Sequence, residues 1–388
     1  MQHRSIVHMD LDSFFVSVER LQNSKLMGVP VIIGGSGGRG VVASCSYEAR
    51  KFGVRSAMPG KMAKRLCPEA IFVRGDMERY SHFSKTVKEI IVEKAPLFEQ
   101  ASIDEFYLDI SGMDKYFGCF KWTSELRETI TRETGLPLSF GLSCNKTVSK
   151  IGTNEAKPNG KNYIMQGNEK NFLAPLDIMS IPMLGNKTGQ MLKSMGVKKI
   201  KTLQEMPLEL MRQVLGKNGK SIWEKANGIC HAMVLPTHDR KSISTENTFQ
   251  ADTIDVKMLR AILTGMTEKI AFRLRKEQQL TSCVAVKIRY SNFDTYAKQM
   301  MIPYTANDKT LIGTALHLFD KLYEKRLLVR LVGVRFSHLV NGSYQINLFE
   351  DTSREVKLCE AMDNARKKFG AKVVSRASGF VKRKVGKG

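Results

Sequence analysis

The sequence predicts a multidomain α+β protein that contains two ferredoxin-like sheets. The chain has 388 residues, 42% of them hydrophobic, which is enough for two to four domains with packed cores. The order strand, helix, strand, strand, helix, strand occurs within residues 6–142 and again within residues 243–338, and this order is typical of ferredoxin-like domains. A run of short helices rich in Gly and Lys separates the two regions.

The charge of the chain indicates a polyanionic partner. Lys and Arg number 61 against 38 Asp and Glu, which gives a formal net charge of +23. Such an excess is typical of proteins that bind nucleic acid, and less often of proteins at anionic membranes. No apolar run is long enough to span a bilayer and the N-terminus leads directly into a charged strand, so we expect a cytoplasmic protein, and a monomer. The seven cysteines form no CxxC pair and are expected to be reduced.

The first strand, Ile6–Asp12, carries a candidate metal-binding carboxylate near its end. Apolar and polar residues alternate along it, and Asp10 lies on the polar face. The FFVSVERL segment that follows has helical spacing, which places Asp10 at a strand-to-helix junction, a common position for a functional site. Asp12 or Ser13 has a simpler interpretation as the N-cap of this helix.

A pair of adjacent carboxylates is predicted at a tight turn. The strands Leu97–Ser102 and Phe106–Ile110 are expected to flank it, with Asp104 and Glu105 at its tip. Carboxylates crowded at one point repel each other, and a hard cation such as Mg²⁺ between them makes the arrangement favourable. An ordinary polar hairpin tip is the alternative. The Asp10 carboxylate favours the metal site, because three carboxylates then converge.

Residues Gly34–Met77 are predicted to be an insertion between the first helix and the helix that starts at Glu78. The apolar runs Val29–Ile33 and Gly40–Ser44 are joined by GGSGGRG, which lacks the GKS or GKT ending of a phosphate-binding Walker loop. Tyr47 and Arg50 follow on one face of a helix start, where a phenol and a guanidinium are suited to a triphosphate. A solvated basic helix start is the alternative.

The first region ends with a helix (Lys121–Thr134), a strand (Leu138–Leu142) and a helix that carries Lys146 and Lys150. The Pro158-Asn159-Gly160 break stops this last helix. Lys157, just before the break, could reach a phosphate over the sheet, although a surface lysine is the simpler interpretation. Short helices follow in Leu173–Cys230, and their turns offer backbone amides that suit phosphodiester oxygens.

The second region begins after a polar linker, Pro236–Thr245. We expect strand 243–250, helix 255–274, strands 282–290 and 295–303, helix 307–323 and strand 330–338. Lys287 and Arg289 alternate with apolar residues and are expected to face outward, where a DNA backbone could lie. A further helix, Val356–Phe369, is predicted near the basic C-terminus.

These motifs resemble those of the Y-family translesion DNA polymerases, most closely the bacterial DNA polymerase IV branch. The resemblance runs from about Ile6 to about Phe349 and rests on HMDLDSFF, on the YEARKFGVRSAMP stretch (Tyr47–Pro59), on the SIDE turn (Ser102–Glu105) and on AKPNG (Ala156–Gly160). It implies a right-hand polymerase with a ferredoxin-like palm, small fingers, a helix-hairpin-helix thumb and a ferredoxin-like little finger. The implied boundaries are 1–33 and 78–167 for the palm, 34–77 for the fingers, 168–235 for the thumb, 236–245 for a linker, 246–340 for the little finger and 341–388 for a C-terminal tail.

The resemblance also implies roles for single residues. Asp10, Asp104 and Glu105 would be catalytic and bind two Mg²⁺ ions, with the main-chain carbonyl of Leu11 as a further ligand. The incoming dNTP would contact Phe14, Phe15, Ser44, Tyr47, Arg50 and Lys157, with Phe15 as the steric gate against a ribose 2′-OH. We expect contacts to primer–template DNA from Lys146, Lys150, Gly185, Thr188, Lys287 and Arg289. The chain departs from relatives at Met183, where the thumb hairpin usually has glycine.

The expected activity is template-directed DNA synthesis of the error-prone translesion type, and no segment suggests a proofreading exonuclease. A nucleotide cyclase on a palm-like sheet and a catalytically inactive DNA-binding scaffold are the alternatives. Residues Gln345, Leu348 and Phe349 resemble the motif by which bacterial polymerases dock on the sliding clamp. Closure of the second core by a final edge strand is the other interpretation of this pentapeptide.

Overall fold

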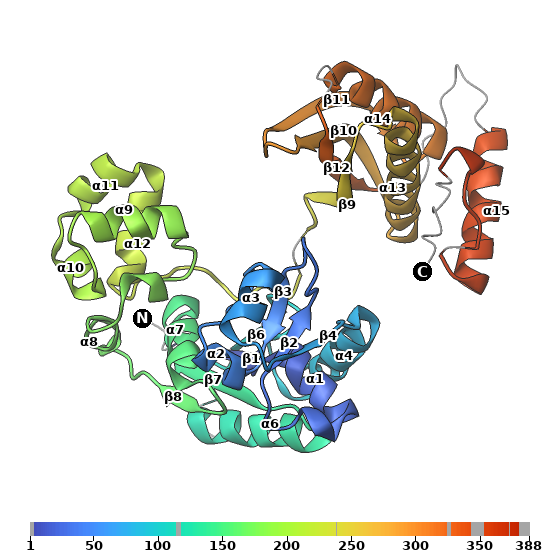
Figure 1. Ribbon diagram of the computed structural model, residues 1–388. Helices are drawn as coiled ribbons and strands as arrows, with labels where there is room; N and C mark the ends of the chain where they lie inside the picture. The colour runs from blue at the N-terminus through green and yellow to red at the C-terminus, as the bar shows by residue number, and fades with distance from the viewer. Residues whose placement is uncertain are drawn as a thin grey trace. The chain divides into compact units, whose positions relative to one another are not determined.

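The computed structural model describes residues 4–113, 118–237, 239–323, 327–342, 353–371 and 373–379. The chain divides into two compact units, residues 1–238 and 239–388, and Figure 1 shows that each combines helices with β-sheet. The division falls inside the predicted linker.

The first unit is built on a five-stranded sheet with β1 at its centre. The strand order is β5 (Phe98–Gln100), β6 (Glu105–Asp109), β1 (Ile6–Leu11), β7 (Leu138–Ser143) and β8 (Lys161–Tyr163). β1 is antiparallel to both of its neighbours, and β8 is added parallel to β7. The four strands from β5 to β7 have the ferredoxin-like arrangement, which confirms the prediction for this region.

Helices cover both faces of this sheet. Residues of α1 (Phe14–Gln22), α4 (Met77–Lys94) and α6 (Cys119–Thr134) share a core with the apolar face of β1. α7 (Lys146–Ala156) packs instead against the polar face, where its Thr153 contacts His8. The alternation predicted for the first strand therefore decides which helix meets Asp10.

The residues between α1 and α4 form a small three-stranded sheet. Its strand order is β3 (Val42–Cys45), β2 (Val31–Gly34) and β4 (Ile71–Val73), accompanied by α2 (Tyr47–Lys51) and α3 (Gly60–Leu66), and a short 3₁₀ turn η1 (Ser24–Leu26) precedes it. A Cβ on Gly40 or Gly60 would lie 1.9 or 2.0 Å from the carbonyl oxygen of Gly35. The glycines thus allow the loop between β2 and β3 and the start of α3 to approach each other closely.

The remainder of the first unit is helical, as predicted. It contains α8 (Glu169–Leu173), η2 (Ile178–Ser180), α9 (Asn186–Ser194), α10 (Ile200–Glu205), α11 (Leu208–Leu215) and α12 (Lys217–Ala226). These helices share a core of their own, joined by apolar residues of α7.

The second unit is a four-stranded antiparallel sheet with helices packed against it. The strand order is β11 (Thr295–Thr305), β10 (Gln279–Tyr290), β12 (Val329–Asn341) and β9 (Ser242–Thr253), and the helices are α13 (Val256–Lys276) and α14 (Asp308–Leu322). The predicted order of elements is confirmed. The last strand, β12, lies between β10 and β9, whereas in the first unit the first strand is central.

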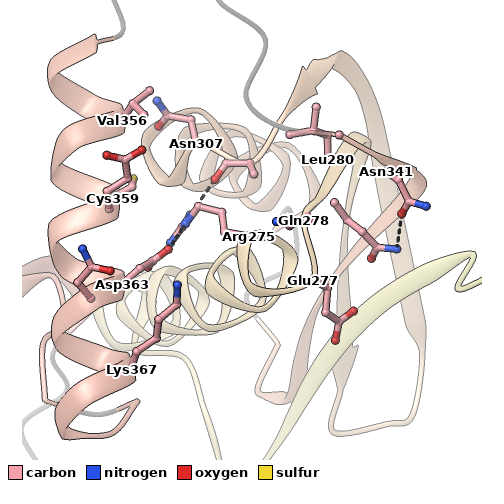
Figure 2. A pocket seen from close by; sticks show the side chains of 15 residues that line it. Arg275, Glu277, Gln278, Leu280, Asn307, Asn341, Val356, Cys359, Asp363 and Lys367 are labelled. Atoms are coloured by element: carbon pink, nitrogen blue, oxygen red, sulfur yellow. Dashed lines mark hydrogen bonds and ion pairs between the residues drawn. The ribbon is translucent and has the colours of Figure 1, made fainter.

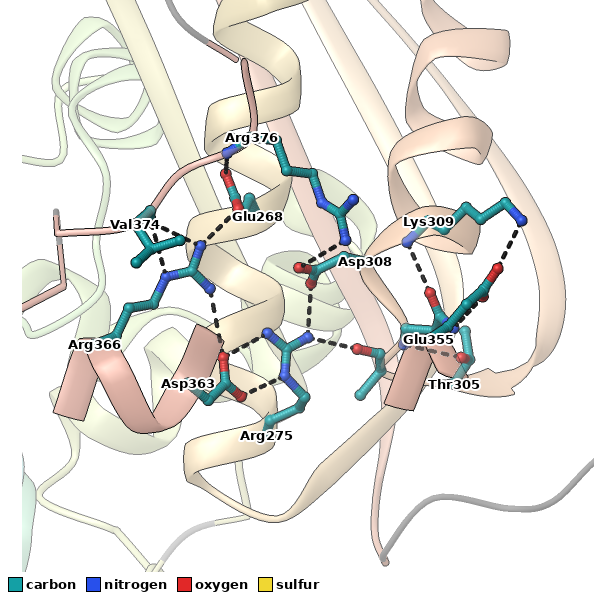
Figure 3. Close-up of polar contacts among 12 residues, drawn as sticks. Glu268, Arg275, Thr305, Asp308, Lys309, Glu355, Asp363, Arg366, Val374 and Arg376 are labelled. Atoms are coloured by element: carbon teal, nitrogen blue, oxygen red, sulfur yellow. Dashed lines mark hydrogen bonds and ion pairs between the residues drawn. The ribbon is translucent and has the colours of Figure 1, made fainter. Parts of the chain in front are cut away.

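α15 (Ser353–Phe369) and the 3₁₀ turn η3 (Ala377–Gly379) complete the second unit. Ion pairs join α15 to α13, with Arg366 to Glu268 at 2.6 Å and Arg275 to Asp363 at 2.6 Å, and Arg275 also reaches Asp308 of α14 at 2.7 Å (Figure 3). A cavity of about 930 Å³ lies between α15 and the ends of β10 and β12 (Figure 2).

Two expectations from composition have structural counterparts. All seven cysteines are free. Within the described ranges, none of the helices combines the length and apolar composition that a membrane crossing requires.

Candidate active site

The backbone brings the three predicted carboxylates to one place. Asp10 stands directly opposite Glu105 in the pairing of β1 with β6. Leu11 donates its main-chain N–H to the carbonyl oxygen of Asp104 at 3.0 Å. β5 ends at Gln100 and β6 begins at Glu105, so the chain turns where the sequence predicted a turn.

Each carboxylate has a partner within the protein. Lys157, which follows α7, pairs with Asp10, and Lys150 of α7 pairs with Glu105. The Ser102 hydroxyl donates to Asp104 Oδ1. In the described part of the chain, no three Asp, Glu, His or Cys side chains are gathered into a ready-made metal site. The two lysines supply the positive charge that these carboxylates need in this arrangement.

The donor chemistry of the site fits Mg²⁺. Burial raises the pKa of Asp10 to about 7, and the charges of Asp104 and Glu105 add to this effect, while Lys157 opposes it. The candidate ligands are carboxylate and carbonyl oxygens, the hard donors that Mg²⁺ prefers. A cation among them would relieve the repulsion that raises the pKa of Asp10.

His8 forms the wall of this site on the side of α7. It is completely buried, and burial, reinforced by the Lys150 ammonium, holds its pKa well below the usual value. Its Nδ1 lies 2.9 Å from the Thr153 hydroxyl, and its Nε2 lies 3.9 Å from Glu105 Oε1. The neutral ring adds no charge to the site.

The two phenylalanines at the start of α1 differ in accessibility. Phe14 is only 2% exposed and packs in the core of the first unit, and its predicted contact with a nucleotide stays a prediction. Phe15 is half-buried and stacks on Tyr80 with ring centroids 4.3 Å apart. Tyr80 is itself fixed by a hydrogen bond of 2.6 Å from its hydroxyl to Glu19.

The residues predicted to hold a triphosphate come from two segments. Tyr47 and Arg50 lie on α2, with the Arg50 guanidinium 4.7 Å from the centre of the Tyr47 ring, and Ser44 lies just before them on β3. Lys157 approaches from the other segment and pairs with Asp10. Tyr47 reaches the first strand through a hydrogen bond of 3.0 Å from its hydroxyl to Asp12 Oδ1.

Lys146 is paired within the protein, and its predicted contact with DNA stays a prediction. Its ammonium donates to both carboxylate oxygens of Glu99 at 2.6 and 2.7 Å, and it lies 4.5 Å from the centre of the Tyr107 ring. Lys150 is likewise paired, with Glu105, which places it at the carboxylates.

The other residues predicted to contact DNA lie in two places. Gly185 is exposed at the N-cap of α9, and Thr188 lies half-buried in the first turn of that helix. In the second unit, Lys287 pairs with Glu246, and the Arg289 guanidinium donates to the Thr295 hydroxyl at 2.8 Å. Lys287 and Arg289 are more accessible than their apolar neighbours on β10, as alternation predicted.

Met183 adopts a left-handed backbone conformation in the turn before α9. Its φ is 71° and its side chain is 93% exposed. The turn before α9 is therefore formed by a residue that favours this region of φ much less than glycine does. The predicted clamp-binding residues Gln345, Leu348 and Phe349 lie outside the described residues.

The role of Asp12 could not be seen in the sequence. The sequence indicates Asp12 or Ser13 as the N-cap of α1, and Ser13 holds that position, although without a side-chain cap, whereas Asp12 binds distant groups. Alternation placed Asp12 beside Asp10, which was the available signal. Its partners lie 35 to 147 residues away, beyond the range of local pattern.

The sequence matches two models of a known protein family and is similar to proteins of known name. Residues 9–154 match the impB/mucB/samB family, and residues 240–348 match the C-terminal domain of the same family. A protein named DNA polymerase IV from Dehalococcoides mccartyi is 38% identical over 374 residues, which cover 95% of this chain and 96% of that protein. A protein of the same name from Treponema denticola is 35% identical and covers 95% of each chain.

Solved structures of polymerases are also similar. The Y-family DNA polymerase chimera Dbh-Dpo4(243-245)-Dbh is 26% identical with a TM-score of 0.76, and the match covers 87% of this chain and 100% of that chain. The structure titled as the insertion ternary complex of Dbh DNA polymerase is 25% identical with a TM-score of 0.63 over the same shares.

Proposed function

Because the chain belongs to the Y-family translesion DNA polymerases, in the bacterial DNA polymerase IV branch, we propose that its catalytic centre is the junction of β1, β6 and α7. The protein is a template-directed DNA polymerase of the error-prone type. The observation that carries the proposal is the pairing of the backbone. Asp10 lies opposite Glu105 in the pairing of β1 with β6, and the main-chain carbonyl of Asp104 accepts a hydrogen bond from the N–H of Leu11. Neither the cyclase nor the inactive-scaffold interpretation is favoured.

Asp10, Asp104, Glu105 and the carbonyl of Leu11 would hold two Mg²⁺ ions. When bound, such ions activate the primer 3′-hydroxyl and offset the charge of the departing pyrophosphate. With Asp10 and Glu105 holding cations, Lys157 and Lys150 would be available to bind phosphate oxygens. Each lysine would thus replace its contact with a carboxylate by a contact with a phosphate, which is also negatively charged.

Tyr47, Arg50, Lys157 and Ser44 would hold the triphosphate of the incoming dNTP. Arg50 offers a planar guanidinium that suits phosphate oxygens, and its stacking on Tyr47 limits its freedom before the nucleotide arrives. Phe15 would stand against the sugar, where its ring leaves no room for a ribose 2′-hydroxyl. The protein acts mainly by positioning and by neutralising charge.

The contacts to primer–template DNA would come from Lys146 and Lys150 on α7, from the thumb hairpin at Gly185 and Thr188, and from β10 at Lys287 and Arg289. The start of α9 offers free backbone amides to a phosphate, which requires no base reading. We place the start of the fingers at β2, because β2 pairs with β3 and β4. The remaining domain boundaries are proposed as the sequence implied them, as are a cytoplasmic location, a monomeric state and docking on a sliding clamp through Gln345, Leu348 and Phe349.

Primer extension tests the assignment of the carboxylates. Asp104→Asn is expected to lower the rate of nucleotide addition by about a hundredfold to a thousandfold, because charge stabilisation is lost. Affinity for primer–template should stay within about twofold, since the phosphate contacts remain. Asp109→Asn, at the far end of β6 and hydrogen-bonded to Ser111, is the matched control and should extend normally. Substantial extension by Asp104→Asn would overturn the assignment.

A further inference from the structure

Asp12 is a buried carboxylate that binds three segments of the chain. It is 2% exposed and accepts hydrogen bonds from the Tyr47 hydroxyl at 3.0 Å, the Ser139 hydroxyl at 2.8 Å and the Asn159 backbone N–H at 2.8 Å. These donors lie on α2, on β7 and in the loop after α7. We propose that Asp12 is a positioning residue for the triphosphate ligands, an inference that rests on the nucleotide site proposed above.

One carboxylate oxygen acts on α2. Oδ1 accepts the hydrogen bond from Tyr47, and the Arg50 guanidinium stacks over the same ring at 4.7 Å. A hydrogen bond to a charged acceptor is stronger than one between neutral groups. Asp12 therefore fixes the Tyr47 ring directly and the Arg50 guanidinium through it.

The other oxygen acts on the loop that carries Lys157. Oδ2 accepts from the Asn159 N–H, two residues beyond Lys157, and from Ser139. The Ser139 hydroxyl in turn accepts the Gly160 N–H at 3.1 Å. Two consecutive amides of the loop are thus tied, directly or through Ser139, to one carboxylate.

The contacts of Asp12 distinguish it from the metal-binding carboxylates. Three donors direct their hydrogens at its two oxygens, whereas Asp10 and Glu105 are held by lysines that can exchange for other cations. A carboxylate with this set of bonds is organised for holding protein groups. Asp12 connects α2 and the Lys157 loop, the two segments that supply the proposed triphosphate ligands.

Asp12→Asn tests the contact with Tyr47 apart from the contact with the loop after α7. The amide oxygen of the variant must face Asn159, because a backbone N–H can only donate, and the amide nitrogen then faces Tyr47. Tyr47 loses its charged acceptor while the loop keeps its own. We expect KM for dNTP to rise about five- to tenfold and kcat to stay within about twofold. This is the result expected when a variant weakens the binding of substrate and of transition state equally.

Direct binding provides a second readout. The Kd for dNTP of the complex with a dideoxy-terminated primer–template should rise by the same factor as KM, while melting temperature stays close to that of the parent protein. If Asp12 acted only through its negative charge, neutralising it would strengthen phosphate binding. An unchanged or lowered Kd would therefore overturn the proposal.

A double-mutant cycle tests whether Asp12 acts through Tyr47. Tyr47→Phe keeps the ring but removes the hydroxyl, so Asp12→Asn should add little to its effect. Fully additive effects would overturn the proposal. Ser17→Ala is the matched control, because the Ser17 hydroxyl donates to the main-chain carbonyl of Asp12 at 2.7 Å and leaves its carboxylate untouched.

The same panel separates this inference from the nucleotide site on which it rests. If Arg50→Ala and Tyr47→Phe raise the Kd for dNTP and Asp12→Asn does not, the nucleotide site stands and the positioning role is wrong. If none of the three changes the Kd, the nucleotide site itself is wrong.

Discussion

At the scale of single residues, Asp10 combines burial with a charge that the protein must balance. Its pKa is raised from 3.8 to about 7, chiefly by burial. The folded state then holds this proton more tightly than the unfolded chain, so in the metal-free protein the contribution of Asp10 to stability decreases as the pH rises from about 4 to about 7. Lys157 limits this loss, because its ammonium remains beside the ionised carboxylate.

We expect Mg²⁺ affinity to fall as the pH drops below about 7. A cation must displace the proton that Asp10 retains there, which links metal binding to proton release. Isothermal titration calorimetry at pH 6.5, in two buffers of different ionisation enthalpy, should detect released protons, and the release should vanish near pH 8.5. Asp10→Asn is the control and should release none. Equal proton release at both pH values would contradict the role assigned to Asp10.

Phe15→Ala is expected to reduce discrimination against ribonucleotides by about tenfold or more. The missing ring leaves space for a 2′-hydroxyl, and a steric contact is the simplest source of selectivity at this position. The measurement is kcat/KM for matched rNTP and dNTP in single-nucleotide insertion. Phe14→Leu is the matched control: it should lower the melting temperature, because Phe14 is buried, without changing discrimination. Unchanged discrimination in Phe15→Ala would assign Phe15 to packing alone.

At the scale of elements, the sequence predicted those features that follow from the spacing of apolar residues and from the positions of turns. The alternation in β1 and the turn before β6 were enough to predict that Asp10, Asp104 and Glu105 lie together. Pairings between distant segments were not accessible in this way. The sequence did not reveal that Glu99 on β5 pairs with Lys146, nor that β2 pairs with β4 in a separate three-stranded sheet.

α15 shows how an element outside the matched family domains is held. The family match ends at residue 348, and α15 begins at Ser353. Arg366 and Glu268 form an ion pair in which the side chains are 3% and 5% exposed, and the Arg366 guanidinium also lies 5.4 Å from the centre of the Phe272 ring. Charges buried in this way depend on each other, because neither has water as an alternative partner.

Arg366→Met is expected to lower the free energy of unfolding of the second unit by about 3 to 5 kcal/mol, because Glu268 is left as a buried charge. Both tryptophans, Trp122 and Trp223, belong to the first unit. Circular dichroism should therefore show an early transition that tryptophan fluorescence does not follow.

Two further variants test this explanation of the ion pair. Adding Glu268→Leu to Arg366→Met should recover much of the loss, since the unpaired charge is then gone. The exposed Lys367 on the same helix provides the control, and Lys367→Met should unfold as the parent protein does. A parallel shift of the fluorescence transition in Arg366→Met would contradict a local role.

At the scale of the whole molecule, the charge of +23 supports strong but unspecific attraction to DNA. Contacts of this kind exchange readily with salt ions, so a polymerase that relies on them dissociates often from the primer end. Attachment to a partner that encircles DNA would raise its effective concentration there. The candidate attachment peptide lies between β12, which ends at Asn341, and α15, which begins at Ser353.

We expect Leu348→Ala combined with Phe349→Ala to abolish stimulation of synthesis by a sliding clamp. In the proposed docking mode, these two side chains fill an apolar pocket on the clamp while Gln345 bonds at its rim, and few residues carry most of the affinity. Primer extension with and without loaded clamp measures the effect, and extension without clamp should be unchanged. Asn347→Ala, within the same peptide, is the matched control and should keep most of the stimulation. If the double variant melts at a markedly lower temperature and loses clamp-independent activity in parallel, Leu348 and Phe349 belong to the core of the second unit.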